Sequence, residues 1–250
     1  MATTRMLSPD DALVSFSKVE LQNPGFAGPL LENLTFTLHR GQSLVLTGPA
    51  GNGKSAAISL VMGGAKATAG RVAVFGRHPH LLDGDDLDAM RARIGYVPQN
   101  GGLLSNLLLA DNVTLPLRYH RGADDASVRT ALSSVQALLG IEDLPAITSA
   151  LAPLRLRRLA ALARAIILEP ELLVVDEPAR DLAGFAKVDF WKLLARLQAD
   201  RGIAILAATS DAETAYALGG QVVSLPGRHH GSVARPGEPA PIGTGIFRQT

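Results

Sequence analysis

The sequence predicts an α/β fold in which a mostly parallel sheet is covered by helices on both faces. Short apolar segments typical of buried strands alternate along the chain with helical segments, and this alternation favours a parallel sheet. In addition, the glycine-rich segment Gly48–Ser55 lies between one such strand and one such helix. A turn of this kind directs successive backbone N–H groups at one point, beside the positive end of the helix dipole.

The first part of the chain contains most of the predicted strands. In order, we expect strands over Ala12–Glu20, Leu34–His39 and Ser43–Thr47, a helix over Ala56–Met62, and strands over Arg71–Gly76 and Ile94–Pro98. The second of these strands alternates apolar and polar residues, as a strand with one solvated face does. The third, Ser-Leu-Val-Leu-Thr, is predicted to be buried.

The character of the sequence changes after the fifth of these strands. From Asn100 to Leu156 it contains helical stretches such as Val128–Leu139 and no convincing strand, so we interpret it as a mostly helical insertion. The alternation then resumes with a strand over Leu172–Asp176, an amphipathic helix over Gly184–Asp200, and strands over Ile203–Ala208 and Gln221–Leu225. We predict one domain over residues 1–250, with a core formed by about 12–99 and 157–225, a helical subdomain over about 100–156, and an irregular tail over 226–250.

Composition limits the classes of function. A chain of 250 residues is long enough for one domain with a full core, and its net charge of +1 gives no overall attraction for nucleic acid or for an anionic membrane surface. The absence of cysteine excludes disulfides and thiol chemistry. The N-terminus has no signal-peptide core, and no apolar segment is long enough to span a bilayer, so we expect any membrane role to depend on a partner.

The segment between the third strand and the following helix fits the pattern G-x-x-x-x-G-K-[ST]. It consists of Gly48-Pro49-Ala50-Gly51-Asn52-Gly53-Lys54-Ser55. In this motif the backbone N–H groups surround phosphate oxygens, Lys54 reaches the β- and γ-phosphates, and Ser55 holds Mg²⁺. The sequence therefore predicts binding of a nucleoside triphosphate, with Ala56 included at the end of the binding segment.

An acidic pair follows the buried strand Leu172–Asp176. Asp176 and Glu177 are predicted at the carboxyl edge of the sheet, where ligands bind in such folds. Asp176 would position Mg²⁺, and Glu177 would orient or deprotonate the attacking water. Taken alone, the pair is more often a solvated strand end, but its combination with the phosphate loop favours the catalytic role. Gln99 follows another strand, and its amide could coordinate the metal and sense the γ-phosphate, although such a residue taken alone is an ordinary loop residue.

The order of these segments resembles the nucleotide-binding subunit of an ATP-binding-cassette (ABC) transporter. The segment Arg91–Gln99 leads into the helical insertion, the Ala-Leu-Ala-Arg helix Arg158–Ile166 comes later, and a strand then ends in Asp-Glu-Pro. The resemblance covers roughly Ala12 to Leu225. It implies a P-loop NTPase core with a mostly parallel sheet, an antiparallel β subdomain on the N-terminal side and a helical insertion. It also implies ATP and Mg²⁺ as cofactors and hydrolysis of ATP to ADP and phosphate.

The resemblance also implies partners. A second ATP-binding subunit, identical or different, would form a head-to-tail dimer with this chain on an integral membrane permease, at the cytoplasmic face of the bacterial inner membrane. The segments Gln99–Leu107 and Asp111–His120 resemble cassettes of the mammalian-cell-entry type, which serve lipid transport and imply a periplasmic lipid-binding subunit. No nucleic-acid partner is expected. Phe26 would stack on adenine, as a loop aromatic does in the family, or would act as a buried staple for the Pro24-Gly25 turn.

Several residues depart from the family pattern. The family's signature Leu-Ser-Gly-Gly-Gln aligns with Ala152–Leu156, none of which matches, and Arg155 there is either a replacement phosphate ligand or a solvated charge. Ala183 stands where the family has an aspartate, although neighbouring Asp181 could substitute for it. Ser210 replaces the switch histidine, and Ala56 replaces a threonine. The residues that bind nucleotide within one subunit are kept, whereas those that complete catalysis across the dimer are changed.

Two functions are therefore expected. The first is an ATP-binding subunit that energises or regulates lipid transport, with hydrolysis that is slow or depends on a partner. The alternative is a structural or regulatory module that binds ATP and hardly hydrolyses it. An unrelated phosphate-loop enzyme such as a kinase does not account for the Gln99 segment or for the Ala-Leu-Ala-Arg helix.

Overall fold

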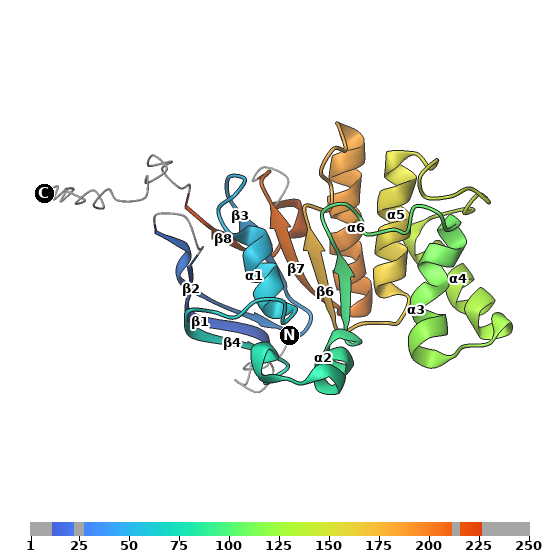
Figure 1. Cartoon of the computed structure of the whole chain (residues 1–250). Coiled ribbons are helices and arrows are strands. Elements are labelled where there is room, and N and C mark those ends of the chain that lie inside the picture. Colours follow the sequence, from blue (N-terminus) through green and yellow to red (C-terminus); the bar gives the residue numbers. More distant parts are fainter. Residues whose placement is uncertain (1–11, 23–27, 212–215, 227–250) are drawn as a thin grey trace, which may run out of the picture.

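A computed structural model describes residues 12–22, 28–211 and 216–226, and within them the strands form two sheets (Figure 1). The strands are β1 (Ala12–Gln22), β2 (Pro29–His39), β3 (Ser43–Thr47), β4 (Ala69–Val74), β5 (Ile94–Val97), β6 (Leu172–Asp176), β7 (Ala204–Thr209) and β8 (Gln221–Ser224). Five of them form a parallel sheet in the order β5-β6-β7-β3-β8. The other three form an antiparallel sheet in the order β2-β1-β4. This architecture confirms the predicted α/β class with its antiparallel N-terminal part.

Six α-helices complete the described part of the chain. They are α1 (Lys54–Val61), α2 (Gly84–Arg91), α3 (Leu109–Arg121), α4 (Asp125–Leu139), α5 (Leu154–Ile166) and α6 (Phe185–Arg201). In Figure 1 the antiparallel sheet lies on the side of α1, whereas α3, α4 and α5 gather at the opposite end of the molecule. In residues 12–22, 28–211 and 216–226 no helix is both long enough and apolar enough to cross a membrane.

Two of these helices are not among the sequence expectations. The first, α2, has a clear start signal, because the Asp83 side chain accepts a hydrogen bond from the Asp86 N–H at 3.0 Å. Helix α3 contains Pro116 in its interior, and proline there weakens the local helical pattern because it removes a backbone donor. Between β5 and β6 the chain forms α3, α4 and α5 with only an isolated bridge between Leu108 and Thr148. The boundaries of the core and of the helical subdomain remain a proposal.

The parallel sheet separates two hydrophobic cores. Successive residues of a strand point to opposite faces, so Leu44 joins the core beneath the antiparallel sheet and α1, whereas Val45 joins the core formed with α3 to α6. All residues of β3, β6 and β7 are buried. Burial on both faces requires near-continuous apolar strands. At the carboxyl edge of the sheet these apolar strands end, and the polar residues described next begin there.

Candidate functional site

The phosphate loop Gly48–Ser55 joins the carboxyl end of β3 to the start of α1. Gly48 has φ of 140°, and a Cβ atom there would lie 2.1 Å from Asn52 Nδ2 and 2.4 Å from the Leu225 carbonyl oxygen. Asn52 Nδ2 donates to that same carbonyl at 2.7 Å, so the loop is fixed to the end of β8. Only glycine fits position 48 without displacing this bond.

Lys54 lies inside the loop with its ammonium group directed at backbone oxygens. Its Nζ donates to the carbonyls of Gly48 at 2.7 Å and Pro49 at 2.9 Å, and to Asn52 Oδ1 at 3.3 Å. The residue is only 5% exposed. Burial lowers the pKa of Lys54, and the negative charges of Glu177 and Asp176 oppose that shift. The ammonium group of Lys54 therefore lies inside the loop, where it could contact a bound anion.

The acidic pair lies at the same edge of the sheet. Glu177 follows β6 with φ of 48°, and its N–H donates to the Ala208 carbonyl at 2.8 Å. One carboxylate oxygen is 3.9 Å from Lys54 Nζ, and the other accepts from Thr209 Oγ1 at 3.4 Å. The structure thus brings Glu177 and Lys54 together, as expected of the two motifs. Thr209, at the end of β7, contacts the second carboxylate oxygen of Glu177.

Asp176 has the features of a metal ligand. It is 4% exposed, and its Oδ1 atom has no hydrogen-bond partner within the described part of the chain. Burial raises the pKa of Asp176, a hydrogen bond with Ser55 opposes that shift, and the charge of Glu177 adds to it. A buried carboxylate oxygen without a partner, beside the Ser55 hydroxyl, fits the oxygen ligands that Mg²⁺ prefers.

Removing the Asp176 charge is expected to stabilise the protein in the absence of nucleotide and Mg²⁺. Because the pKa of the folded state is raised, the aspartate disfavours folding as pH rises through that pKa. We expect Asp176→Asn to raise the Tm at pH 8 by about 2–4 °C, the shift that ~1 kcal/mol produces in a chain of this size. The gain should shrink as pH falls. Thermal melts between pH 8 and pH 5 test this, with exposed Asp200→Asn as control; an unchanged or lower Tm at pH 8 contradicts it.

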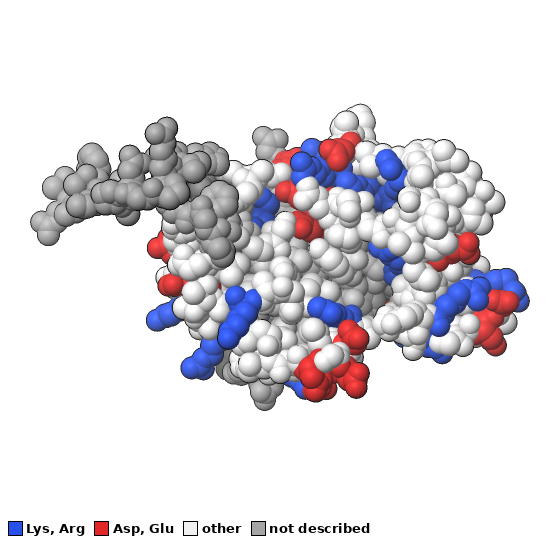
Figure 2. All heavy atoms as spheres, in the orientation of Figure 1, with Lys and Arg blue, Asp and Glu red and all other residues white. Residues whose placement is uncertain are grey.

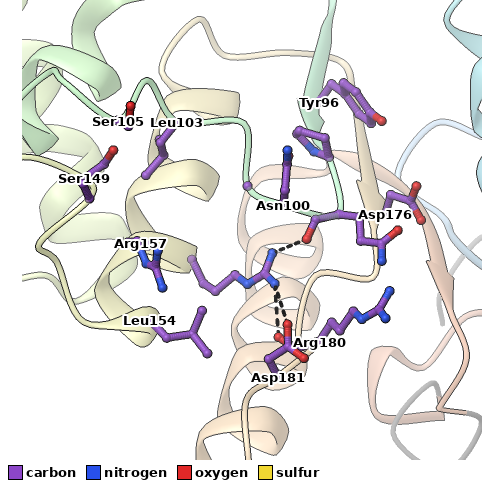
Figure 3. A pocket seen from close by; sticks show the side chains of 15 residues that line it. Tyr96, Asn100, Leu103, Ser105, Ser149, Leu154, Arg157, Asp176, Arg180 and Asp181 are labelled. Carbon is purple, nitrogen blue, oxygen red and sulfur yellow. Dashed lines mark hydrogen bonds and ion pairs between the residues drawn. The ribbon is translucent and has the colours of Figure 1, made fainter.

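Gln99 borders a cavity of about 750 Å³ that also contains Asp176 (Figure 3). The cavity lies between the loop after β5, the start of α5 and the loop after β6. Gln99 is half-buried, and its backbone carbonyl accepts from Arg158 Nη1 at 2.7 Å. Arg164 donates to the carbonyls of Gly102 at 2.7 Å and Gly101 at 3.1 Å. Two guanidinium groups of α5 therefore hold the loop that carries Gln99.

The residues that we expected to replace dimer-spanning positions of the family do not all lie at this cavity. Pro153 precedes α5 without a capping side-chain hydrogen bond, and Leu154 lines the large cavity. Arg155 is exposed and lines a different cavity, between α4, α5 and α6. Asp181 is exposed and lies 3.7 Å from Arg158 Nη2. Ser210 is exposed and borders a cavity of about 110 Å³ with Glu177.

Phe26 lies outside the described residues, as does nearly all of the tail predicted over 226–250.

Sequence reasoning assigned no role to Arg158, Arg180 or Thr209. A helical pattern could have found Arg158, because it lies three residues before Ala161 and four before Leu162 on the buried face of α5. Figure 2 shows basic side chains gathered along the carboxyl edge of the sheet, at the upper border of the view, with acidic side chains among them.

Comparison with known proteins places this geometry in context. The model of the family described as ABC transporter matches residues 31–180. The sulfate/thiosulfate import ATP-binding protein CysA 1 of Chromobacterium violaceum is 31% identical over 85% of this chain and 58% of its own length, so the chain spans little more than half of that relative. The ABC transporter ATP-binding protein YxdL of Bacillus subtilis is 30% identical over 72% of this chain and 70% of its own length.

Solved structures share the fold. The ATP-binding cassette MJ0796, in a dimeric post-hydrolysis state bound to ADP and Pi, has a TM-score of 0.76 and 24% identity over 85% of this chain and 94% of that chain. The protein cbiO1 of Clostridium perfringens, part of a transporter complex, has a TM-score of 0.71 and 23% identity over 80% of this chain and 79% of that chain.

Proposed function

The chain belongs to the ABC transporter family, and on that premise we propose that it is an ATP-binding subunit that binds Mg-ATP between its phosphate loop and its acidic pair. The observation that carries this proposal is the position of Lys54, which lies inside the loop and 3.9 Å from the carboxylate of Glu177. Ser55 and Asp176 share a hydrogen bond beside them. A cation for phosphate, oxygen ligands for a metal and a carboxylate for water are thus gathered at one edge of the sheet.

Each residue has a defined task in this proposal. The backbone N–H groups of Gly48–Ser55 and the start of α1 at Ala56 surround the phosphates, and Lys54 binds the β- and γ-phosphate oxygens. Ser55, Asp176 and the amide of Gln99 would hold Mg²⁺, which would neutralise charge on the phosphates. Glu177 orients the attacking water or accepts its proton, with Thr209 holding the second carboxylate oxygen. The products are ADP and phosphate.

The proposed assembly contains two ATP-binding subunits and an integral membrane permease. The dimeric form of MJ0796, which has the same fold, supports a dimer of cassettes. The chain would then associate with the cytoplasmic face of the inner membrane through the permease. No helix in the described part of the chain is long and apolar enough to insert directly. Phe26 is proposed to stack on adenine, in the same assembly.

The cargo is proposed on narrower grounds. Relatives with printed functions import sulfate or thiosulfate, sn-glycerol-3-phosphate, and methionine. Our proposal of lipid transport, with a periplasmic lipid-binding subunit, rests on the segments Gln99–Leu107 and Asp111–His120, which resemble lipid-transport cassettes. They form the loop after β5 and most of α3.

A second candidate function is a nucleotide-binding module that hardly hydrolyses ATP. The observation that favours it is the identity of two residues, one before α5 and one beside Glu177. Pro153 precedes α5 where the family has a serine, and Ser210 lies beside Glu177 where the family has a histidine. Pro153 lacks a backbone donor, and the Ser210 hydroxyl is shorter than an imidazole.

Calorimetric titration of the isolated chain with Mg-ATP tests the proposed function. We expect saturable binding of Mg-ATP and no binding of AMP at the same concentrations, because AMP lacks the phosphates that Lys54 and the metal ligands contact. Equal binding of the two nucleotides, or no binding of either, contradicts the proposal.

A further inference from the structure

Arg180 is a cation at the border of the acidic pair, and none of the described residues pairs with its side chain. It lies three residues after Glu177, in the loop between β6 and α6. Its side chain borders both the 750 Å³ cavity that contains Gln99 and Asp176 and the 110 Å³ cavity that contains Glu177 and Ser210. In Figure 3 it extends toward the side of the large cavity where Asp176 lies. Within the described residues its guanidinium makes no hydrogen bond or ion pair.

The backbone of Arg180, by contrast, is fixed. Its N–H donates to the Glu177 carbonyl at 3.0 Å, and its carbonyl accepts from Arg158 Nη2 at 3.2 Å. Arg158 is itself buried, at 5% exposure. Glu177 and Asp181 have positive φ angles of 48° and 66°, so the loop takes a tight course on both sides of Arg180. The backbone of Arg180 is therefore fixed beside the acidic pair, while its exposed side chain keeps its donors available.

The charges around Arg180 indicate what it can bind. Arg180 lines the same cavity of about 750 Å³ as Asp176 and the same cavity of about 110 Å³ as Glu177, so its side chain and the two carboxylates border common spaces. An arginine that pairs structurally with a carboxylate would form hydrogen bonds to it, and within the described part of the chain Arg180 forms none to Asp176, Glu177 or Asp181. The five N–H donors of a guanidinium that borders these cavities suit a phosphate group, whose oxygens a guanidinium binds in pairs.

We propose that Arg180 binds the terminal phosphate of the nucleotide held by its own chain, where it supplies donors that Ser210 is too short to supply. This inference rests on the proposed function. It assigns Arg180 as a ligand that distinguishes the triphosphate from the diphosphate, since a residue that contacts the terminal phosphate has nothing to bind in ADP.

The test compares the affinities of Mg-AMP-PNP, a non-hydrolysable triphosphate analogue, and Mg-ADP for the parent chain, Arg180→Ala and Arg180→Lys. We expect Arg180→Ala to weaken binding of the analogue about tenfold, which corresponds to ~1.4 kcal/mol, and to leave ADP affinity unchanged. Arg180→Lys should restore part of the loss, because it keeps the charge without the paired donors. Arg157→Ala is the matched control, since Arg157 is exposed and lines the same cavity on the side away from Arg180 (Figure 3).

Three outcomes overturn the assignment. The first is an unchanged affinity of Arg180→Ala for the analogue. The second is an equal loss of affinity for the analogue and for ADP, which indicates that the positive charge acts on both nucleotides without contacting the terminal phosphate. The third is the same loss in Arg157→Ala. In each of these cases a parent chain that binds both nucleotides leaves the proposed function standing. If a folded parent chain binds neither nucleotide, the proposed function is wrong and the role of Arg180 is wrong with it. Thermal melts of each variant confirm that the chains compared are folded.

Discussion

We expect that restoring the family's residues before α5 and at position 210 will raise Glu177-dependent ATP turnover about a hundred- to a thousandfold. The restored chain carries Pro153→Ser, Leu154→Gly, Arg155→Gly and Ser210→His. Preorganised donors that contact a developing charge contribute on the order of 10²–10³ in rate. In the proposed function the parent lacks them at Pro153 and Ser210, while Glu177, the carboxylate proposed to activate water, is held by Thr209. The cavity of about 110 Å³ beside Ser210 gives a longer side chain room next to Glu177.

Phosphate release from the parent and restored chains, each beside its Glu177→Gln variant, measures this effect. The glutamine variants identify turnover by contaminating enzymes, because only turnover by this site depends on Glu177. A parent chain that already hydrolyses ATP as fast as the restored chain shows that the changed residues do not limit catalysis. A restored chain that binds Mg-ATP but stays as slow as the parent favours the structural or regulatory module.

We expect Lys54→Ala to lower the affinity for Mg-ATP roughly ten- to a hundredfold. The substitution removes the cation proposed to bind the β- and γ-phosphates, and a hydrogen bond to a charged group contributes about 1.5–3 kcal/mol. Calorimetric titration gives the two dissociation constants. Exposed Lys66→Ala is the matched control, since it removes the same charge away from the site.

Lys54 also holds the carbonyls of Gly48 and Pro49, so its removal could loosen the loop itself. Ser55→Ala tests the site without disturbing these bonds, because it leaves Lys54 in place and removes a hydroxyl proposed to bind Mg²⁺. We expect Ser55→Ala to weaken binding only when Mg²⁺ is present. Equal affinities of Lys54→Ala and the parent contradict the assignment of the phosphate loop.

The parallel sheet was predictable because its strands are buried on both faces. Strands such as β3 and β6 must then be apolar along their length, and a short apolar run next to a glycine-rich or acidic turn is a clear pattern. The positions of the segment Gly48–Ser55 and of the acidic pair were predictable because a sequence motif marks the first and each directly follows such a strand.

Residues that act through tertiary contacts were not predictable from local patterns. Thr209 reaches Glu177 only because β7 pairs with β6, and nothing near Thr209 in the sequence signals that contact. Arg180 borders the site because the loop after β6 turns sharply at Glu177. Helix α3 escaped prediction because Pro116 interrupts its local signal while the core around Leu109 and Val113 stabilises it.

The hydrogen bonds of Arg158 and Arg164 join α5 to the Gln99 loop, so that the helix and the loop move together. Three carbonyls of that loop are held by guanidinium groups on a single helix, so a rotation of α5 displaces the backbone at Gln99. The same helix reaches the loop after β6 through the Arg180 carbonyl. A force applied to the helices between β5 and β6 is therefore transmitted to both borders of the nucleotide site at once, and a rearrangement of those borders is transmitted back to the helices.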